Sequence, residues 1–378
     1  MSDLFVLLAA GGTGGHLFPA FALAEELGRR GVPVELATDM RGDRYGTGFP
    51  ARKVHQIPSA TLGGRDPVSV AKTGVTLSRG IAMAYRLLGA IKPAAVVGFG
   101  GYPSFPPLLA ARMRGIPSAL HEQNAVLGRA NRMLAKRVTA IATSFEQVKL
   151  IDDNLLPKVR FTGNPVRQMV LDAAKTPFPT LGANDTFKLL VFGGSQGARY
   201  FSDAVPPALA TLPDNIKGRL HVVQQAREED LQRVHDAYTA AHIRSDVAAF
   251  FPNLPEIMAS SHLVIGRAGA SSVAELAVIG RPSILVPLPH ALDNDQLHNA
   301  MRLADGGGAW CIAQADLSPE RLVAHITHLI HNPSELGTAA AAAKAQGKPD
   351  AVVRFADLVE ELMGRKVVPS PRFLRGEG

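Results

Sequence analysis

This sequence contains three short glycine-rich turns that also carry polar side chains. Consecutive backbone N–H groups together with polar side chains can bind anions. The first runs from Gly11 to His16 (GGTGGH), the second from Gly98 to Ser104 (GFGGYPS) and the third from Gly193 to Arg199 (GGSQGAR). Each follows a short apolar run, the pattern of a buried strand that leads into a phosphate-binding helix N-terminus. A P-loop is missing, and Pro103 stands where the third glycine of a dinucleotide fingerprint belongs. The turns therefore predict phosphate binding, but not through NAD or ATP.

His16 is the first candidate for catalysis. It closes the first turn, ahead of a helix expected to begin near Pro19, and the positive end of a helix dipole keeps an imidazole neutral. A neutral imidazole can accept the proton of an attacking hydroxyl. The alternative is that His16 orders the loop or contacts a phosphate, together with its substrate-binding neighbours Thr13, Gly14 and Gly15. Glu122, just after a strand-like run, is a rival base.

The elements that position these turns alternate between strand-like and helix-like stretches, which predicts parallel sheets covered by helices on both faces. The strand, glycine turn and helix of residues 5–27 recur at residues 188–212. We therefore expect an α/β fold of two Rossmann-like, doubly wound domains, residues 1–163 and 164–346, with a cleft between them. A C-terminal helix at about 350–364 could return to the first domain, and the tail from Arg365 is expected to be loose.

Composition narrows the class of protein. The chain has 378 residues, 46% of them hydrophobic, and its single cysteine, Cys311, excludes a disulfide framework or a cysteine-rich zinc site. The start Met-Ser-Asp lacks the basic region of a signal peptide, and no apolar run approaches the ~18 residues of a membrane span. A formal net charge of +7 favours an anionic partner. Nucleic acid is disfavoured, because aromatic residues are few and no basic run interleaves with them.

Six motifs together resemble the MurG family of GT-B glycosyltransferases. They lie in family order across about residues 5–310: Gly11–His16, Gly100–Tyr102, His121–Asn124, Gly163–Arg167, Gly193–Ala198, and Arg267–Ala270 with Glu275. Members of this family move GlcNAc from UDP-GlcNAc onto lipid I, which forms lipid II for peptidoglycan. The resemblance implies an inverting transfer to the C4 hydroxyl of the MurNAc-pentapeptide, without a cofactor. It also implies a lipid acceptor on the N-terminal domain and a nucleotide donor held mainly by the C-terminal domain.

The resemblance also assigns donor-binding roles to individual residues. Asn124 and Gln296 would contact the donor sugar, although the loop before Asp293 carries an apparent one-residue insertion relative to the family. Arg167 and the Ser195 turn would bind the diphosphate, where the leaving group develops negative charge. The backbone of Phe251 would contact uracil. The helix start beside the nucleotide comprises Ala270, Ser271, Ser272, Val273 and Ala274.

Glu275 and an aspartate pair each allow two interpretations. The sequence Ser272-Val273-Ala274-Glu275 satisfies a capping box, in which Glu275 would bond the Ser272 amide. The family instead places this glutamate on the ribose hydroxyls, where two charge-assisted hydrogen bonds give specificity, and we favour that role. Asp293 and Asp295 resemble a metal-binding DxD motif, but a hard cation usually needs more oxygen ligands. We therefore expect no metal, and turnover that persists in EDTA.

Residues 68–91 are expected to form a helix with two opposed faces, although Gly74, Gly80 and Gly89 weaken it. One face is predicted to meet the core through Leu77, Ile81, Ala84, Leu88 and Ile91. The other alternates apolar and basic residues, namely Val68, Lys72, Val75, Arg79, Met83 and Arg86. This second face is either an ordinary solvated surface or one that rests on anionic lipid headgroups. The lipid acceptor favours the second, which predicts a peripheral protein on the cytoplasmic face of the plasma (inner) membrane.

Three classes of function remain in competition at this point. A sugar-nucleotide transferase leads, followed by a nucleotide-sugar epimerase or hydrolase of the same architecture, and then by a nicotinamide-dependent oxidoreductase. The missing GxGxxG fingerprint argues against the last. A non-catalytic binding scaffold is the remaining option. It would not need candidate polar residues in both domains, as this sequence has.

Overall fold

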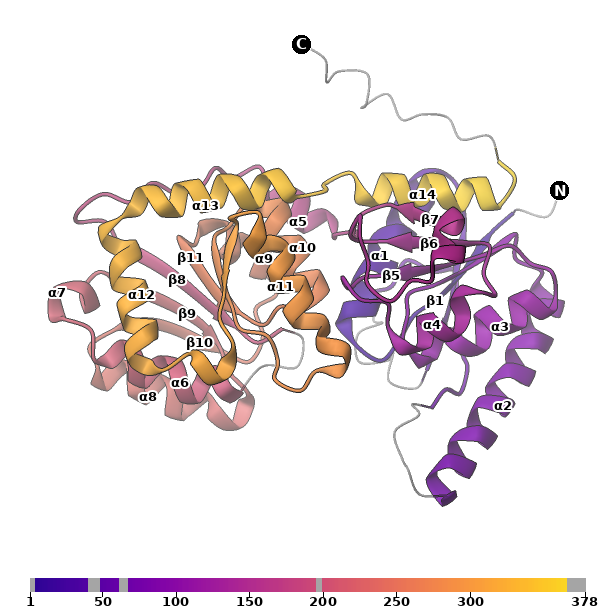
Figure 1. The fold of residues 1–378 in the computed structure, drawn as a ribbon, viewed down its shortest axis with the longest axis horizontal. Coiled ribbons are helices and arrows are strands. Elements are labelled where there is room, and N and C mark those ends of the chain that lie inside the picture. Colours follow the sequence, from indigo (N-terminus) through magenta and orange to yellow (C-terminus); the bar gives the residue numbers. More distant parts are fainter. Residues whose placement is uncertain (1–3, 40–47, 61–66, 195–198, 366–378) are drawn as a thin grey trace, which may run out of the picture. The chain divides into compact units, whose positions relative to one another are not determined.

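The computed structural model describes residues 4–39, 48–60, 67–194 and 199–365. The chain divides into two compact units, of which the first contains Met1–Arg167 together with Pro349–Gly378 and the second contains Gln168–Lys348 (Figure 1). Each unit is an open, entirely parallel sheet with helices on both of its faces.

The first unit is built on a seven-stranded sheet in the order β3-β2-β1-β4-β5-β6-β7. Its strands are β1 (Val6–Ala9), β2 (Val34–Thr38), β3 (Lys53–Gln56), β4 (Ala95–Gly98), β5 (Ser118–Glu122), β6 (Ala140–Thr143) and β7 (Val159–Phe161). Its helices are α1 (Gly14–Arg29), α2 (Pro67–Ile91), α3 (Phe105–Met113), α4 (Arg129–Ala135) and α14 (Ala351–Leu362).

The second unit is built on a six-stranded sheet in the order β10-β9-β8-β11-β12-β13. Its strands are β8 (Phe187–Phe192), β9 (Leu220–Gln225), β10 (Arg244–Ala248), β11 (Leu263–Gly266), β12 (Ser283–Leu285) and β13 (Ala309–Cys311). Its helices are α5 (Gln168–Ala173), α6 (Arg199–Ala210), α7 (Asp214–Lys217), α8 (Leu231–Ala240), α9 (Leu254–Ser260), α10 (Ala270–Ile279), α11 (Asp295–Asp305), α12 (Pro319–His331) and α13 (Pro333–Gln346).

Strand β1 shows why its sequence is apolar without interruption. Side chains alternate between the two faces of a strand, and both faces of this sheet are covered. Val6 and Leu8 enter the core beneath α1 and α14, whereas Leu7 and Ala9 enter the core beneath α2, α3 and α4. A polar residue at any of the four positions would be buried without a partner.

The strand order of each unit reverses next to the strand that precedes a glycine turn. In the first unit the reversal lies between β1 and β4, so the turns that follow these two strands are neighbours. In the second unit it lies between β8 and β11, which brings the Gly193 turn beside the Arg267–Gly269 turn. Ligands bind in parallel sheets at such switch points, because adjacent loops diverge there to opposite faces.

Helix α1 begins earlier than its sequence predicted. Its first residue is Gly14 rather than a residue near Pro19, and the amides of His16 and Leu17 both donate to the Thr13 carbonyl at 3.2 Å. Pro19 lies inside the helix, which weakened the sequence signal because a proline there removes one intrahelical hydrogen bond. His16 is therefore in the first helical turn, and Gly14 and Gly15 belong to the helix, whereas Gly11 and Gly12 precede it.

Helix α2 is continuous through its three glycines. A Cβ at Gly80 would stand 2.1 Å from the carbonyl oxygen of Pro58, so glycine is required for the helix to approach this segment. The predicted core face is confirmed, since Ala84 and Leu88 are buried and Leu77, Ile81 and Ile91 are half-buried.

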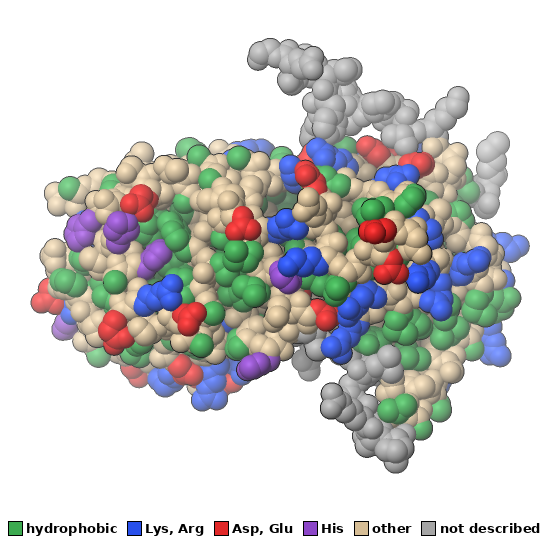
Figure 2. Space-filling model, viewed as in Figure 1, with side chains coloured by type: hydrophobic (Ala, Val, Ile, Leu, Met, Phe, Trp, Pro, Cys, Tyr) green, Lys and Arg blue, Asp and Glu red, His purple; other side chains and the backbone are tan. Residues whose placement is uncertain are grey.

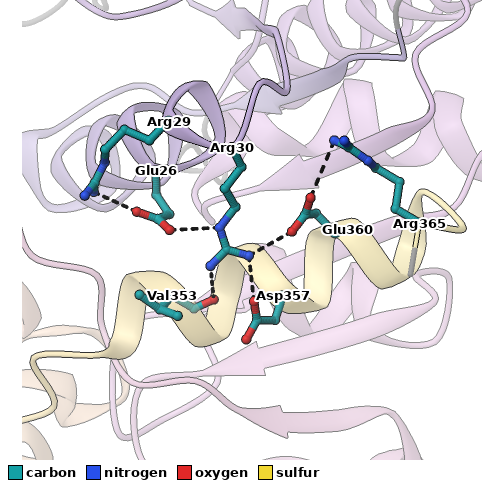
Figure 3. A network of polar contacts seen from close by, with 7 residues as sticks. All are labelled: Glu26, Arg29, Arg30, Val353, Asp357, Glu360 and Arg365. Carbon is teal, nitrogen blue, oxygen red and sulfur yellow. Dashed lines mark hydrogen bonds and ion pairs between the residues drawn. The ribbon is translucent and has the colours of Figure 1, made fainter. Parts of the chain in front are cut away.

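The C-terminal helix α14 packs on α1 through a shared hydrophobic core and through Arg30, which follows α1. Arg30 binds Asp357 Oδ1 at 2.6 Å, Glu360 Oε2 at 2.8 Å and the Val353 carbonyl at 3.2 Å, all on α14 (Figure 3). It also binds Glu26 Oε1 on its own helix at 2.8 Å. Three carboxylates around one cation raise the pKa of Arg30 despite its burial, so this guanidinium stays charged.

We expect Arg30→Ala to lower the free energy of unfolding of the first unit by about 3 kcal/mol, because Asp357 loses its cation, and Glu26 and Glu360 keep only Arg29 and Arg365. Arg29→Ala is the matched control. Arg29 binds only Glu26, and its side chain is 54% exposed compared with 16% for Arg30, so its loss should cost under about 1 kcal/mol. Urea denaturation of both variants measures the difference, and equal effects would contradict the role of Arg30.

Candidate functional site

The first two glycine turns meet at His16 in the first unit. Gly100 and Gly101 have φ angles of 80° and 66°, which only glycine adopts without strain. A Cβ at Gly101 would lie 3.2 Å from His16 Nε2, so the turn after β4 lies directly against the imidazole. The Ser104 hydroxyl joins the two turns, since it lies 2.8 Å from the carbonyl oxygens of Ala9 and Gly100. Two segments far apart in the sequence thus lie side by side at His16.

The His16 imidazole is half-buried, and its Nδ1 atom is enclosed without a hydrogen-bond partner. Burial is the main cause that lowers the pKa of His16 below its ordinary value. The Gln123 side chain and the Phe99 carbonyl oppose this lowering, although neither reaches Nδ1 with hydrogen-bonding geometry. Burial rather than the helix dipole therefore accounts for an imidazole that is neutral near pH 7.

Glu122 is buried, and both of its carboxylate oxygens already accept hydrogen bonds. Oε1 accepts from the backbone amide and side chain of Asn124 at 2.9 and 3.2 Å, and Oε2 accepts from the Gly128 amide and Asn131 Nδ2 at 2.8 and 2.7 Å. Burial raises the pKa of Glu122, while these four donors oppose the rise. This geometry favours a positioning role, in which Glu122 holds the loop that carries Asn124, over its role as the rival base.

Arg167 lies beside the N-terminal turns of α1. Its guanidinium carbon is 4.2 Å from the centroid of the Phe18 ring, two residues beyond His16, so its planar group stacks on this helix. The sequence alone allowed an exposed linker arginine, whereas the structure half-buries it against the first glycine turn. In the first unit, Arg167 and His16 thus belong to one neighbourhood.

In the second unit, helix α10 begins at Ala270 with Gly269 as its N-cap. Ser272 therefore lies within the first turn and is not the cap, so the capping-box interpretation of Glu275 is wrong. The helix begins three residues earlier than a cap at Ser272 would place it, because Gly269 adopts the extended conformation of a cap and its carbonyl accepts from the Val273 amide at 3.0 Å. Glu275 is 6% exposed and lies in the second turn of this helix.

Gln296 lies in the first turn of α11, directly after two left-handed residues, Asp293 and Asn294. Its Oε1 atom accepts from the Leu288 amide at 3.0 Å, which directs the amide nitrogen away from that backbone. Asp295 accepts from the Gln296 amide at 2.8 Å and so serves the helix start. Within the described residues, no three His, Cys, Asp or Glu side chains are placed to hold a metal ion.

Gln225, at the end of β9, links two segments at the carboxyl edge of this sheet. It accepts from the Gly193 amide at 3.3 Å and donates to the Ala249 carbonyl at 3.1 Å, so it joins the third glycine turn to the segment that leads to Phe251. Phe251 itself is half-buried after β10. Ser195, the diphosphate candidate of that turn, lies outside the described residues.

Three polar side chains near these turns had no role assigned from the sequence; Gln123 and Arg267 are buried and Gln225 is half-buried. Gln123 contacts the second turn, Gln225 braces the third, and Arg267 donates to the carbonyls of Val286 and Pro287 and to Gln314 Oε1 at 3.0, 3.1 and 2.6 Å. Gln123 and Arg267 stood within the quoted motifs. Gln225 carried no sequence signal, because only the pairing of β9 with β8 and β10 brings it to the turn.

The face of α2 opposite the core is exposed at all five positions proposed to contact a membrane. These residues are Lys72, Val75, Arg79, Met83 and Arg86. No helix within the described ranges combines the length and apolar character that a membrane crossing requires.

Family models match both units. The Glycosyltransferase family 28 N-terminal domain matches residues 6–143, and the Glycosyltransferase family 28 C-terminal domain matches residues 188–355. The first match includes the glycine turns at residues 11–16 and 98–104, and the second includes the turn at residues 193–199.

Similar proteins carry a common name. A Rhizobium etli (strain CIAT 652) protein is 51% identical over 97% of this chain and 98% of its own length. A Mesorhizobium japonicum protein is 53% identical over 96% of each chain. Both are named UDP-N-acetylglucosamine--N-acetylmuramyl-(pentapeptide) pyrophosphoryl-undecaprenol N-acetylglucosamine transferase.

Solved structures of two enzyme classes share this fold. The crystal structure of Acinetobacter baumannii MurG has a TM-score of 0.77 and 29% identity, and it covers 95% of this chain and 99% of that one. A Neisseria meningitidis UDP-GlcNAc 2-epimerase bound to UDP-GlcNAc has a TM-score of 0.66 over 95% and 99% of the two chains. At 14% identity the epimerase shows only a shared fold.

Proposed function

This chain belongs to glycosyltransferase family 28, and we propose that it transfers GlcNAc from UDP-GlcNAc to the undecaprenyl-diphosphate-linked MurNAc-pentapeptide, lipid I. It is a glycosyltransferase with the GT-B fold. The observation that carries the substrate assignment is the 51% identity over 97% of the chain to a transferase whose name states both substrates. The product is lipid II, a peptidoglycan precursor.

Incubation with UDP-GlcNAc and a lipid I analogue tests this function, with the product identified by mass. We expect the acceptor to gain one GlcNAc unit and UDP to be released in equal amount. Loss of UDP-GlcNAc at the same rate without acceptor would indicate a hydrolase. Conversion of the sugar nucleotide to its epimer would indicate an epimerase.

The first unit supplies the acceptor side in this proposal. The acceptor hydroxyl oxygen bonds to the anomeric carbon of GlcNAc while the bond from that carbon to the UDP oxygen breaks, and the hydroxyl proton passes to His16. A neutral imidazole beside two glycine turns suits this step, because the turns offer backbone N–H groups to the acceptor diphosphate. Thr13, Gly14 and Gly15 are the proposed contacts, and Glu122 holds the loop of Asn124.

The second unit supplies the donor side. We assign the ribose to Glu275, the nucleotide to the first turn of α10 and the GlcNAc hydroxyls to Gln296. The buried carboxylate of Glu275 and the free direction of the Gln296 amide nitrogen support these assignments. The leaving diphosphate is assigned to the Gly193 turn and Ser195. Arg167, which belongs to the first unit, is the basic residue proposed to stabilise the developing negative charge.

We also propose that the enzyme binds the anionic membrane peripherally through the first unit. Between residues 67 and 137 the only acidic residue is Glu122, which is buried, while the basic residues are Lys72, Arg79, Arg86, Lys92, Arg112, Arg114, Arg129, Arg132, Lys136 and Arg137. Exposed apolar side chains accompany them, including Val75 at 70% and Met113 at 58%. Figure 2 shows Lys, Arg and hydrophobic side chains close together on this unit. A mixed surface of this kind suits the cytoplasmic leaflet.

Replacement of Lys72, Arg79 and Arg86 by Glu should abolish sedimentation with anionic vesicles and leave UDP affinity unchanged. Each basic residue near such a surface contributes ~1 kcal/mol, so the triple change removes about 3 kcal/mol and adds repulsion. The control changes Lys188, Arg244 and Arg321 to Glu, which alters the net charge equally on exposed positions of the second unit. Equal sedimentation of the two triple variants would refute the assignment of α2.

A further inference from the structure

The orientation of the Gln123 side-chain amide is determined by its surroundings. Gln123 is 2% exposed, and its Nε2 atom donates to the Phe99 carbonyl at 2.9 Å and to His121 Nδ1 at 3.0 Å. A rotation of the amide by 180° would set Oε1 against the Phe99 carbonyl oxygen, and two acceptors repel each other. The amide nitrogen therefore faces Phe99 and His121, and Oε1 faces the other way.

The protonation of His121 supports the same orientation. His121 Nε2 lies 3.2 Å from the Gly163 carbonyl oxygen, which only accepts hydrogen bonds, so Nε2 carries the proton. Burial lowers the pKa of His121 to about 4, so the ring is neutral and Nδ1 accepts from Gln123. The ring also stacks on Phe355 of α14, with centroids 4.8 Å apart, which holds it in place.

Gln123 Oε1 and His16 Nδ1 are both buried and both lack a hydrogen-bond partner. They lie on the same side of Gly100, since a Cβ there would stand 3.4 Å from Oε1 and 3.4 Å from His16 Cε1, the carbon bonded to Nδ1. A buried acceptor and a buried potential donor, each unsatisfied, are costly when separate and gain when they pair. Catalytic hydrogen bonds are often long in free enzymes and shorten with substrate.

We propose that Gln123 is a positioning residue that holds His16 in its Nδ1–H tautomer, with Nδ1–H donating to Gln123 Oε1. The inference rests on the proposed function of His16 as the base. In this tautomer the lone pair is on Nε2, beside Gly101, where it receives the acceptor hydroxyl proton as the new glycosidic bond forms and UDP leaves. The chain of hydrogen bonds is directional throughout: His16 donates to Gln123, Gln123 to His121, and His121 to the Gly163 carbonyl.

The neutral amide has a consequence for the base. A carboxylate in the place of Gln123 would attract a proton to His16 strongly and keep the imidazole charged at neutral pH. An amide fixes the tautomer without adding charge, so burial still dominates and the base stays unprotonated. The other titratable groups on the neighbouring strand β5 are His121, which is neutral, and Glu122, whose oxygens are bound by four donors.

The direct test is the ¹⁵N NMR spectrum of the His16 ring in the full chain, assigned by comparison with His16→Ala. Wild type should show a single Nδ1–H tautomer, and Gln123→Met should show a mixture, with a kcat lower on the order of 10- to 100-fold and an unchanged affinity for UDP. Retention of the single tautomer in Gln123→Met would overturn the inference. If wild type formed no lipid II analogue, the proposed function would fail, while the spectrum would still decide the tautomer.

Two further variants keep the test independent of a folding defect. In a His16→Ala background, Gln123→Met should cause no additional loss of turnover, because Gln123 acts through His16; an equal loss in both backgrounds would contradict this. Gln123→Glu retains the size of the side chain and should raise the pKa of His16. The acidic limb of its pH-rate profile should move to higher pH, and an unmoved limb would count against contact between the two side chains.

Discussion

His16→Ala is expected to reduce turnover by a factor on the order of 10²–10⁴, the usual contribution of a general base. Affinity for UDP should remain that of the wild type, because His16 is not among the residues proposed to contact the donor nucleotide. Steady-state assays with UDP-GlcNAc and a lipid I analogue measure the first effect, and calorimetry with UDP measures the second. His235→Ala, an exposed histidine on α8, is the control and should change neither. Normal turnover with weakened donor binding would place His16 on the donor side instead.

The pH dependence of the rate tests the role of His16 as the base independently. The base must be unprotonated, so activity is lost as pH falls through the pKa of His16. Since burial lowers that pKa, the acidic limb should lie below the ordinary histidine value of about 6.5. The limb should be missing from the residual activity of His16→Ala. Its survival there would exclude His16 as the base and return attention to Glu122.

Glu275→Gln is expected to weaken UDP binding by about 1.5–3 kcal/mol, or about 10- to 100-fold, because it removes a charged acceptor from the ribose hydroxyls. The position of the cap at Gly269 leaves no capping role to explain such a loss. Calorimetry with UDP measures the effect, and thermal unfolding of the same samples separates lost binding from lost folding. Glu320→Gln, at an exposed position in the first turn of α12, is the control. Unchanged affinity in Glu275→Gln would leave the ribose without its assigned partner.

Much of the fold can be predicted from local sequence patterns. The apolar runs before the glycine turns predict buried parallel strands, because both faces of such a strand meet hydrophobic side chains. The repeat of strand, turn and helix at residues 5–27 and 188–212 predicts two similar sheets, and β1 and β8 have equivalent places in them. The two faces of α2 follow from helical periodicity alone. These features depend on residues near one another in the chain, which a sequence pattern can reveal.

The exact starts of the helices could be determined only from the tertiary structure, since several neighbouring residues in the sequence could each begin a helix. Pro19 and Ser272 were plausible signals, but the chain geometry places the starts at Gly14 and Ala270. Motifs identified the segments that bear the site. The choice of cap depends on which carbonyl and amide groups the rest of the sheet leaves available.

The roles of the polar side chains in the first unit were decided by contacts between distant segments. Glu122 has the residue type of a base, yet four donors from its own loop and from α4 occupy its oxygens. Gln123 has no distinctive chemistry until the fold sets it between His121 and the turn that covers His16. Arg30 meets Asp357 across 327 residues of sequence. The sequence by itself determined which residues could do chemistry and which strands would present them, whereas their partners, and hence their protonation and orientation, depended on burial and neighbours that only tertiary packing creates.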